Sequence, residues 1–325
     1  MQGLICDRWS EVSELRIGNL EDPRPAADEV LIRVHTTAVN YADSIMVRGH
    51  YQTKPPFPFA PGLETAGEIV ECGAEVTGFA PGDRVMAILA YGGLAELACA
   101  KAAEIYRIPD AMSWQDAAAF PIAYISSHVA IRWQGRLEAG ESMLVLGAAG
   151  GVGLTAIEIG KAMGARVIAA ASTQEKLNAC ISRGADDTLN YAEQDLKEEV
   201  ARLTEGNGVD VVFDPVGGDL FDSALSSLGW GGRILLVGFV GGVPKIPANR
   251  LLVKHRAALG SSLRYFRWHA PKKLEQSVSE LLAWYGEGKL RPMVTETFPL
   301  SGAATAIARL TDRRAIGRIL VEIAG

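Results

Sequence analysis

The apolar positions of the N-terminal third alternate with polar ones, with the period of two that is typical of half-buried β-strands. The longest such stretch is Glu29–Asn40, and shorter runs follow at Ala66–Val70, Arg84–Leu89 and Ala95–Ala100. Gly, Pro or Asp residues bound each run, and Pro81-Gly82 forms a turn between two of them. The pattern predicts an all-β, barrel-like region.

A different pattern begins near the middle of the chain. The apolar run Leu144–Leu146 reads as a buried strand, Gly147–Gly153 as a tight turn, and the following residues as a helix that ends at Gly164. A second strand starts at Arg166, which completes a strand, helix and strand unit of about 30 residues, as a dinucleotide fold requires. Glycine turns also occur in domains that bind nothing, but this context favours a nucleotide site.

The glycine turn has a direct chemical use. Small residues let a diphosphate approach the backbone, and the free N–H groups and positive dipole end of the helix stabilise its charge. The residues expected to hold the diphosphate are Ala149, Gly150, Gly151 and Val152.

The strand and helix alternation continues after this unit and predicts a doubly wound sheet of six parallel strands. The further strands are expected at Asp186–Tyr191, Asp210–Pro215, Gly232–Phe239 and Arg256–Leu263. On the other side of the unit, Ser113 and Asp116 form a capping pattern before one helix, and a second helix is expected over Ile122–Gln134.

The C-terminal residues leave this alternation. The expected elements are a helix over Lys272–Tyr285, a strand over Val294–Pro299, a helix over Ser301–Leu310 and a strand over Arg318–Ile323. We expect them to pack onto the first domain, which makes the nucleotide domain an insertion. The predicted division is residues 1–120 and 266–325 for the first domain and 121–265 for the nucleotide domain.

Irregular backbone is predicted between the first strands. The stretch Asn40–Tyr51 is followed by the proline-rich Lys54–Glu64, and loops on a rigid scaffold are where binding residues concentrate. We expect a substrate mouth here, although the prolines could instead only protect the edges of the barrel.

Composition narrows the function classes. The 325 residues include 32 basic and 38 acidic ones, and this mildly acidic balance gives no indication of a nucleic-acid or membrane surface. No apolar stretch reaches the roughly 18 residues of a membrane span. Cys6, Cys72, Cys99 and Cys180 stand singly, which favours isolated thiols in a reducing compartment. We expect a cytoplasmic protein without membrane insertion.

Four segments together resemble one family. They are Val39–Asp43, Pro61–Gly67, Pro81–Val85 and Ala148–Gly153. With them the chain resembles, from Glu29 to Ile323, the zinc-independent medium-chain dehydrogenases/reductases of the quinone oxidoreductase (zeta-crystallin) branch. The resemblance implies an α/β fold: a GroES-like β-barrel catalytic domain with an inserted six-stranded, doubly wound Rossmann domain.

The chain departs from its wider family at the metal site. Zinc-dependent relatives place a cysteine where Asn40 stands and a histidine where Leu63 stands, and neither residue here supplies the ligands that tetrahedral zinc prefers. No metal is therefore expected. The branch also usually has a glutamine where this chain has Glu158, and several relatives have a tyrosine where Ile45 stands.

The expected cofactor is NADPH. NAD-specific folds usually place an acidic residue after the second strand, and Ala171-Ser172-Thr173 offers none. The resemblance implies that Ser172, Lys176 and Tyr191 bind the 2′-phosphate, although Lys176 could also be an ordinary solvated helix lysine. By the same resemblance, Asn40 lies beside the nicotinamide, Ser126 near the ribose or phosphates, and Phe239 and Val240 at the nicotinamide end.

The expected chemistry is direct hydride transfer from NADPH to a small-molecule quinone or activated alkene, without a metal. Either acceptor gains negative charge on an oxygen in the transition state, which donors would stabilise. Tyr51 is the candidate donor or proton relay, Arg48 is a charge stabiliser or a loop anchor, and Asn40 completes the candidate catalytic set. Tyr41, Arg264 and Arg267 are further candidates.

Two other functions stay open. An NADPH-dependent enal, enone or enoyl-thioester reductase would use the same fold, and Arg264, Arg267, Lys272 and Lys273 could suit a phosphorylated carrier. An NADPH-responsive binding protein is the more distant alternative, because no basic stripe with interleaved aromatics indicates nucleic acid. The resemblance also implies a homodimer or homotetramer, with the edge around Arg256–Leu263 as the contact.

Overall fold

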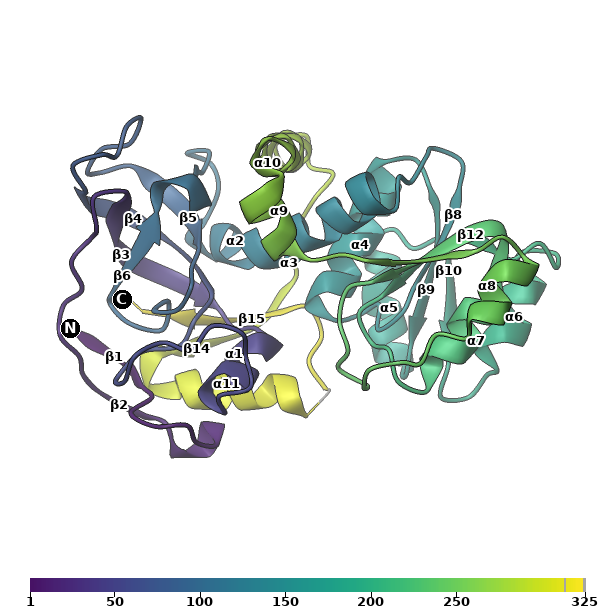
Figure 1. The fold of residues 1–325 in the computed structure, drawn as a ribbon, viewed down its shortest axis with the longest axis horizontal. Helices are drawn as coiled ribbons and strands as arrows, with labels where there is room; N and C mark the ends of the chain where they lie inside the picture. Colours follow the sequence, from purple (N-terminus) through teal and green to yellow (C-terminus); the bar gives the residue numbers. More distant parts are fainter. Residues whose placement is uncertain (313, 324–325) are drawn as a thin grey trace. The chain divides into compact units, whose positions relative to one another are not determined.

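The computed structural model describes residues 1–312 and 314–323. The chain forms two compact units. Unit 1 consists of Met1–Ile122 together with Pro292–Gly325, and unit 2 consists of Ala123–Arg291. Unit 2 is thus inserted into unit 1, as the sequence predicts (Figure 1).

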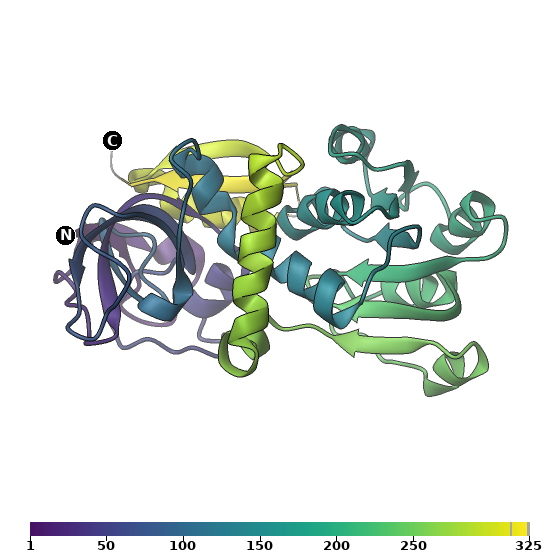
Figure 2. The ribbon, with the colours of Figure 1, turned by 90° about the horizontal axis from the view of Figure 1, so that it is seen from above.

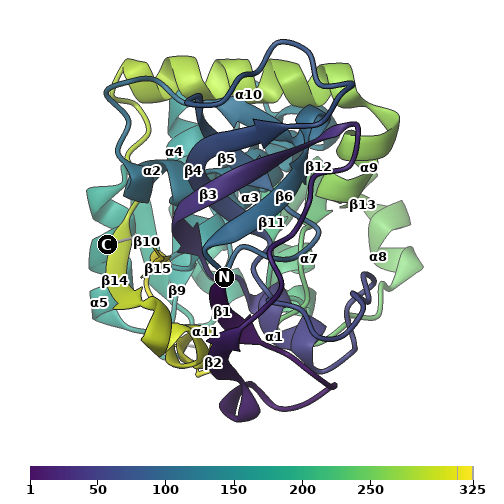
Figure 3. The same ribbon diagram turned by 90° about the vertical axis from the view of Figure 1, so that its left-hand side faces the viewer.

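Unit 1 is built on a seven-stranded sheet in which β14, β15, β3, β4, β5 and β7 follow one another and β6 also pairs with β3. All pairs are antiparallel except β14 with β15. Figure 3 shows unit 1 with the strands of this sheet toward the viewer. The strands are β3 (Glu29–Ala38), β4 (Glu64–Cys72), β5 (Arg84–Ile88), β6 (Leu97–Lys101), β7 (Ile105–Arg107), β14 (Val294–Pro299) and β15 (Arg318–Glu322).

The period-two pattern explains this sheet. The inward side chains Val30, Ile32 and Val34 of β3 are fully buried in one apolar cluster with Ile69 of β4 and Val85 of β5. A one-residue slip would turn these side chains outward, so the alternation fixes the strand register. The predicted barrel-like region is confirmed.

Shorter elements complete unit 1. β1 (Gln2–Ile5) and β2 (Arg16–Asn19) form a separate two-stranded sheet. The helix α2 (Trp114–Ala119) begins with the predicted cap, because Ser113 Oγ accepts a hydrogen bond of 3.0 Å from Asp116 N–H. The remaining helices are α11 (Ala303–Thr311) and the 3₁₀ turns η1 (Val12–Glu14), η2 (Ala102–Glu104) and η4 (Leu300–Gly302).

The stretch expected to be an irregular loop contains a helix, α1 (Tyr41–Val47). Asp43 accepts a hydrogen bond of 2.7 Å from the backbone N–H of Asn40, which closes the first turn. Met46 and Val47 are buried in the core. The helix therefore forms because capping and burial outweigh the weak helix preference of so short a segment.

Unit 2 contains the six-stranded parallel sheet in the order β10-β9-β8-β11-β12-β13. The order reverses between β8 and β11, which is the arrangement of a doubly wound domain. The predicted fold class is confirmed. The strands are β8 (Ser142–Val145), β9 (Arg166–Ala171), β10 (Asp187–Asn190), β11 (Val209–Asp214), β12 (Leu228–Leu236) and β13 (Ala257–Gly260).

Helices cover both faces of this sheet (Figure 2). α4 and α5 follow β8 and β9, whereas α6 and α7 pack through Val200 and Phe221 against the other face. The helices are α3 (Pro121–His128), α4 (Gly151–Ala162), α5 (Gln174–Ser182), α6 (Leu196–Leu203), α7 (Leu220–Ser227), α8 (Ala248–Val253), α9 (Leu263–His269), α10 (Pro271–Gly286) and the π-helix η3 (Val129–Gln134).

The placement of α10 corrects an expectation. The sequence analysis assigns this helix to the first domain, but it lies in unit 2, so the second boundary falls after Arg291 and not after residue 265. Polar contacts hold it there: His128 Nε2 lies 3.0 Å from Glu280 Oε2, and Trp133 Nε1–H donates to Ser277 Oγ at 2.9 Å.

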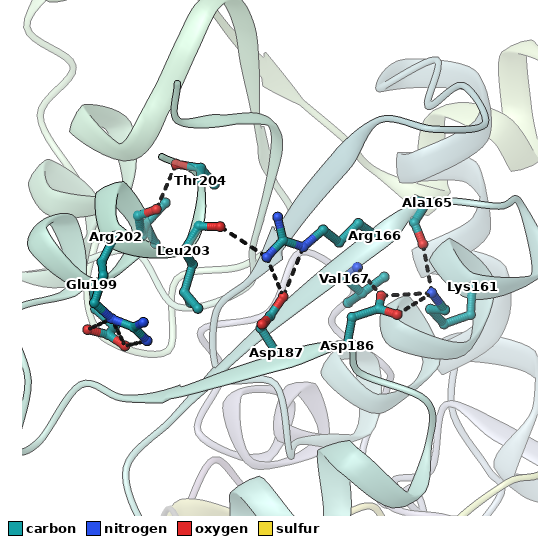
Figure 4. Close-up of polar contacts among 11 residues, drawn as sticks. Lys161, Ala165, Arg166, Val167, Asp186, Asp187, Glu199, Arg202, Leu203 and Thr204 are labelled. Atoms are coloured by element: carbon teal, nitrogen blue, oxygen red, sulfur yellow. Dashed lines mark hydrogen bonds and ion pairs between the residues drawn. The ribbon is translucent and has the colours of Figure 1, made fainter. Parts of the chain in front are cut away.

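Ion pairs join the amino ends of β9 and β10 (Figure 4). Asp186 accepts hydrogen bonds from Lys161 Nζ at 2.7 Å and from the Val167 N–H at 2.7 Å. Arg166 pairs with Asp187 at 2.8 Å and donates to the carbonyl of Leu203. These charges fix the edge of the sheet that lies opposite the glycine turn.

We expect D186N to lower the unfolding free energy at pH 7 by about 1 kcal/mol. Burial disfavours the charged carboxyl, but the hydrogen bonds from Lys161 and Val167 outweigh it and hold the pKa of Asp186 below its ordinary value. This stabilisation exists above the unfolded-state pKa and is lost as the pH falls, so the two proteins should converge below about pH 4. Urea unfolding of the wild type and D186N measures the difference in unfolding free energy. D222N removes the carboxylate of the exposed ion pair with Arg250 and is the control. An equal gap at pH 7 and pH 3 would contradict the expectation.

Candidate functional site

The glycine turn lies at the carboxyl edge of the parallel sheet in unit 2. The N–H of Leu146 donates to Phe213 O, and that of Ala148 donates to Ala170 O, each at 3.0 Å, so the turn is anchored to both neighbouring strands. A Cβ on Gly153 would come within 2.5 Å of Gly147 O and 2.6 Å of Ala148 O. Only glycine permits the helix to start this close to the turn.

The start of α4 offers a site for an anion. Gly150 is the N-cap residue, and no side chain caps this 12-residue helix. The N–H groups of Gly151, Val152 and Gly153 have no acceptor within the helix, by the geometry of a helix start. Together with the positive end of the helix dipole they can hold a diphosphate. The residues therefore fit a dinucleotide, although its geometry here stays a prediction.

The residues expected at the 2′-phosphate emerge along the same edge. Ser172 directly follows β9 and Tyr191 directly follows β10, and the two strands pair through Ala171 and Asn190. Lys176 lies in the first turn of α5, where its backbone N–H donates to Thr173 Oγ1. The side chain of Lys176 is thus presented from a fixed helix start. The topology brings all three residues to one edge.

The segment with Phe239 and Val240 follows β12 at this edge. Both side chains are partly exposed, and the backbone is fixed because Gly241 N–H donates to Val216 O at 2.8 Å. Asp214 Oδ1 accepts hydrogen bonds from the N–H groups of Val216 and Gly217, which shapes the neighbouring turn. An apolar surface next to the glycine turn suits a nicotinamide ring.

Ser126 and its neighbour Ser127 lie on α3. Ser126 is half-buried, while Ser127 is buried and contacts α4: its Oγ lies 3.0 Å from Val152 O and 2.7 Å from Thr155 Oγ1. Ser127 therefore fixes the first turn of α4 through hydrogen bonds to Val152 and Thr155. Sequence reasoning missed Ser127, and no motif distinguishes the two serines.

Unit 1 contains a buried polar cluster that we call the Asn40 cluster: Asn40, Asp43, Glu64 and Arg318. Asn40 Nδ2–H donates to Glu64 Oε1 at 2.8 Å, and its Oδ1 accepts from Arg318 Nη1 at 3.2 Å. Arg318 also pairs with Glu64, and Glu64 Oε2 accepts the Ile122 N–H. The side-chain amide of Asn40 is thus oriented at both ends. Its place beside a nicotinamide stays a prediction.

Charge and burial compete in this cluster. Burial raises the pKa of Asp43 to about 7, against hydrogen bonds from the N–H groups of Asn40 and Gly62. Burial also raises the pKa of Glu64, while Arg318 opposes the rise. Arg318 pairs with Glu64 and is, in the described part of the chain, the only cation whose charge opposes the rise of the pKa of both carboxyls. Sequence spacing could not reveal it, since it lies 254 residues after Glu64.

The other candidate catalytic residues have defined surroundings. Arg48 Nε donates to Glu11 Oε2 at 2.8 Å, which favours its role as a loop anchor. Tyr51 packs its ring against the apolar cluster that contains Met46 and Phe59. Tyr41 is partly exposed at the start of α1. The role of Tyr51 as a donor stays a prediction.

The residues at the zinc position do not fit a metal. Leu63 is buried in an apolar cluster, and both polar ends of the Asn40 side chain are engaged. Among residues 1–312 and 314–323, no three His, Cys, Asp or Glu side chains gather as a metal site requires. Within the same residues, no helix is long and apolar enough to cross a membrane.

Known families and proteins match this chain along its length. The sequence model described as "Alcohol dehydrogenase GroES-like domain" matches residues 26–110, and that of "Zinc-binding dehydrogenase" matches residues 151–284. Quinone oxidoreductase-like protein 2 of Rattus norvegicus is 36% identical over 304 residues, which cover 93% of this chain and 87% of that protein. Quinone oxidoreductase of Homo sapiens is 31% identical, over 91% of this chain and 89% of its own.

One solved structure has a similar fold over nearly the whole chain. Escherichia coli quinone oxidoreductase complexed with NADPH has a TM-score of 0.93 and 26% identity to this chain, covering 99% of this chain and 100% of that one.

Proposed function

Since the chain belongs to the quinone oxidoreductase branch of the medium-chain dehydrogenase/reductase superfamily, we propose that it is an NADPH-dependent quinone oxidoreductase. The observation that carries the proposal is the uncapped start of α4, closed against the glycine turn at the carboxyl edge of β8. Bound NADPH would supply a hydride from its nicotinamide. The chain's own residues bind, orient and stabilise charge.

The choice of nucleotide is supported by the end of β9. Ala171, Ser172 and Thr173 present no carboxylate that would accept the ribose hydroxyls of NADH or repel a 2′-phosphate. Ser172, Lys176 and Tyr191 converge on this edge from two strands and a helix start. A cation and two hydroxyls are suitable partners for a phosphate.

The acceptor side is supported by unit 1. The amide of Asn40 is held in one orientation by Glu64 and Arg318, and its Oδ1 can accept a second hydrogen bond from a bound ring without a metal. Tyr51 is the candidate that donates a hydrogen bond or proton to the acceptor oxygen. A donor aimed at the oxygen that gains charge lowers the barrier to hydride transfer.

The proposal is tested by the initial rate of NADPH oxidation with purified, chelator-treated protein. A soluble ortho-quinone is compared with a 2-alkenal and an enoyl thioester. Fastest turnover of the quinone, undiminished by chelation, is expected. Turnover confined to the alkenal or the thioester would contradict the assignment of a quinone as the acceptor, while the assignment of NADPH as the cofactor would stand. No turnover with any of the three acceptors would favour an NADPH-responsive binding protein.

We expect Y51F to lower kcat for the quinone by at least about tenfold with little change in KM, because the phenyl ring keeps the packing and loses the O–H. Steady-state kinetics over pH 5–9 measure both constants. Y91F, at an exposed tyrosine of the same unit whose ring contacts Phe59 edge-on, is the matched control. Unchanged kcat for every acceptor would exclude the relay.

One observation favours a second candidate, an NADPH-dependent enoyl-thioester reductase. The segment from α9 into α10 carries Arg264, Arg267, Lys272 and Lys273 without an acidic residue among them. Such a segment could bind the phosphates of a carrier thioester. R267Q/K272Q should then raise KM for the enoyl thioester severalfold and leave KM for a small enal unchanged; equal effects on both would remove this candidate.

We propose that the protein forms a homodimer through the free edge of β13. We also propose that it is cytoplasmic, because its four cysteines are free thiols. β13 pairs with β12 on one side, and no strand of the described residues pairs with its other side. Leu252 and Val253 on the adjacent α8 are 83% and 68% exposed, which a second copy could cover. Light scattering should give twice the chain mass for the wild type and a smaller mass for L252K/V253K. A wild-type mass of one chain would contradict the dimer.

A further inference from the structure

Glu158 is a buried carboxyl on α4 that the proposed cofactor contacts leave unused. Its side chain is 5% exposed, and residues from three separate segments of unit 2 contact its two oxygens. Tyr124 O–H from α3 donates to Oε2 at 2.5 Å, and the backbone N–H of Arg291 donates to both oxygens at 3.3 and 3.4 Å. Arg183 Nη1, at the end of α5, lies 3.5 Å from Oε1.

These partners lie where the chain passes between its two units. We call each point where the chain leaves one unit and enters the other a passage. The first passage is at Ile122 and Ala123, and Tyr124 is the next residue. The second passage follows Arg291, whose N–H is bound to Glu158. The carboxyl of Glu158 on α4 is therefore hydrogen-bonded to a residue beside each passage.

The same network of hydrogen bonds continues toward the start of α4. Thr155, one turn before Glu158, has its Oγ1 3.2 Å from Ala123 O and 2.9 Å from Val152 O. Ser127 Oγ contacts both Val152 O and Thr155 Oγ1. The segment that enters unit 2 is thus joined by hydrogen bonds to the first turn of α4, where the cofactor diphosphate is proposed to bind.

We propose that Glu158 is a positioning residue for cofactor binding: its carboxylate clamps both inter-unit passages to α4, and uptake of a proton loosens this clamp. The part that concerns NADPH affinity rests on the proposed function. The clamp itself rests only on the contacts of Glu158.

The charge state of Glu158 is open to change near neutral pH. Burial raises its pKa to about 7, and hydrogen bonds from Tyr124, Arg183 and Arg291 oppose the rise. The charged and titratable side chains that face it are Tyr124 from α3 and Arg183, the residue after α5, while Lys161 on α4 itself pairs with Asp186. A protonated carboxyl no longer neutralises Arg183, and one of its oxygens becomes a donor. Each contact of the clamp weakens.

The direct test is hydrogen exchange of the Arg291 amide in the full chain at pH 6 and pH 8, expressed as a protection factor. In the wild type we expect protection to be at least about tenfold greater at pH 8. E158Q keeps an acceptor and loses the titration, so its protection should not depend on pH. E158L should lose the protection at both pH values. E198Q removes an exposed carboxylate of the same unit and is the matched control.

The second readout is the dissociation constant for NADPH from its fluorescence. The 2′-phosphate titrates near pH 6 itself, so the signal is the difference between wild type and E158Q, which share this ligand. We expect the wild type to lose about threefold more affinity between pH 8 and pH 6 than E158Q does.

Either of two results would overturn the proposal: Arg291 protection in E158L equal to the wild type, or a wild-type pH dependence retained in E158Q. If E158L does not fold, Y124F removes one contact of the clamp, and wild-type Arg291 protection in Y124F together with a pH-dependent E158Q would overturn the proposal equally. Absence of NADPH binding at every pH would refute the proposed cofactor, while the exchange experiment would still decide on the clamp.

Discussion

K176E should lower kcat/KM for NADPH by about 100-fold and change kcat/KM for NADH by less than about threefold. The substitution removes a charged hydrogen-bond donor, worth about 1.5–3 kcal/mol, and places a negative charge beside the 2′-phosphate. NADH has no 2′-phosphate, so it is spared both effects. The start of α5 should survive, because its cap uses the backbone N–H of residue 176 and the hydroxyl of Thr173.

Steady-state kinetics with both nucleotides and one quinone measure this selectivity. K197E makes the same charge change on the exposed face of α6 and should leave both nucleotides unaffected. Similar losses for NADPH and NADH in K176E would refute the assignment of Lys176, and a similar NADPH loss in K197E would reduce it to a general effect of net charge.

R318M should lower the unfolding free energy at pH 8 by about 3–5 kcal/mol, because it leaves the buried carboxyls of Glu64 and Asp43 without a cation. The side chain of Arg318 is 8% exposed, so water cannot replace the lost partner readily. The loss should be smaller at pH 6. An acid whose pKa is raised in the folded state destabilises that state as the pH rises through the raised value, and protonation removes the penalty.

Denaturant unfolding at both pH values measures this effect. R309M removes an exposed arginine of the same unit, paired with Glu296 at 3.5 Å, and should cost less than about 1 kcal/mol. Adding E64Q to R318M should restore part of the stability, since the amide does not need a cation. Equal stabilities of R318M and R309M would show that the Asn40 cluster is not held by its ion pair.

The two groups of residues proposed to bind ligands depend on different physics. At the glycine turn of unit 2 the groups proposed to bind the diphosphate are backbone N–H donors at a helix start, which need glycine and close packing but no particular side chain. In unit 1 they are side chains, and Asn40 is oriented only because Glu64 and Arg318 are buried with it. Substitutions at the glycine turn should therefore affect cofactor affinity through the shape of the turn, whereas substitutions in the Asn40 cluster should affect acceptor chemistry through charge.

The sequence by itself determined the elements whose signals are local. The period-two run of β3, the strand, turn and helix from β8 to α4, and the cap of α2 at Ser113 all follow from residues a few positions apart. The position of the proposed diphosphate site also follows, because the helix start is built from one continuous stretch.

Only the tertiary structure decided the rest. It assigned α10 to unit 2 through His128 and Ser277, made α1 a helix through burial, and brought Arg318 to Asn40 across 278 residues. It also showed that Glu158, which the sequence pattern treats as a tolerated helix residue, contacts three separate segments of unit 2. Periodicity and turn chemistry act between near neighbours, whereas buried charges must find partners wherever the fold supplies them, and no spacing along the chain encodes that choice.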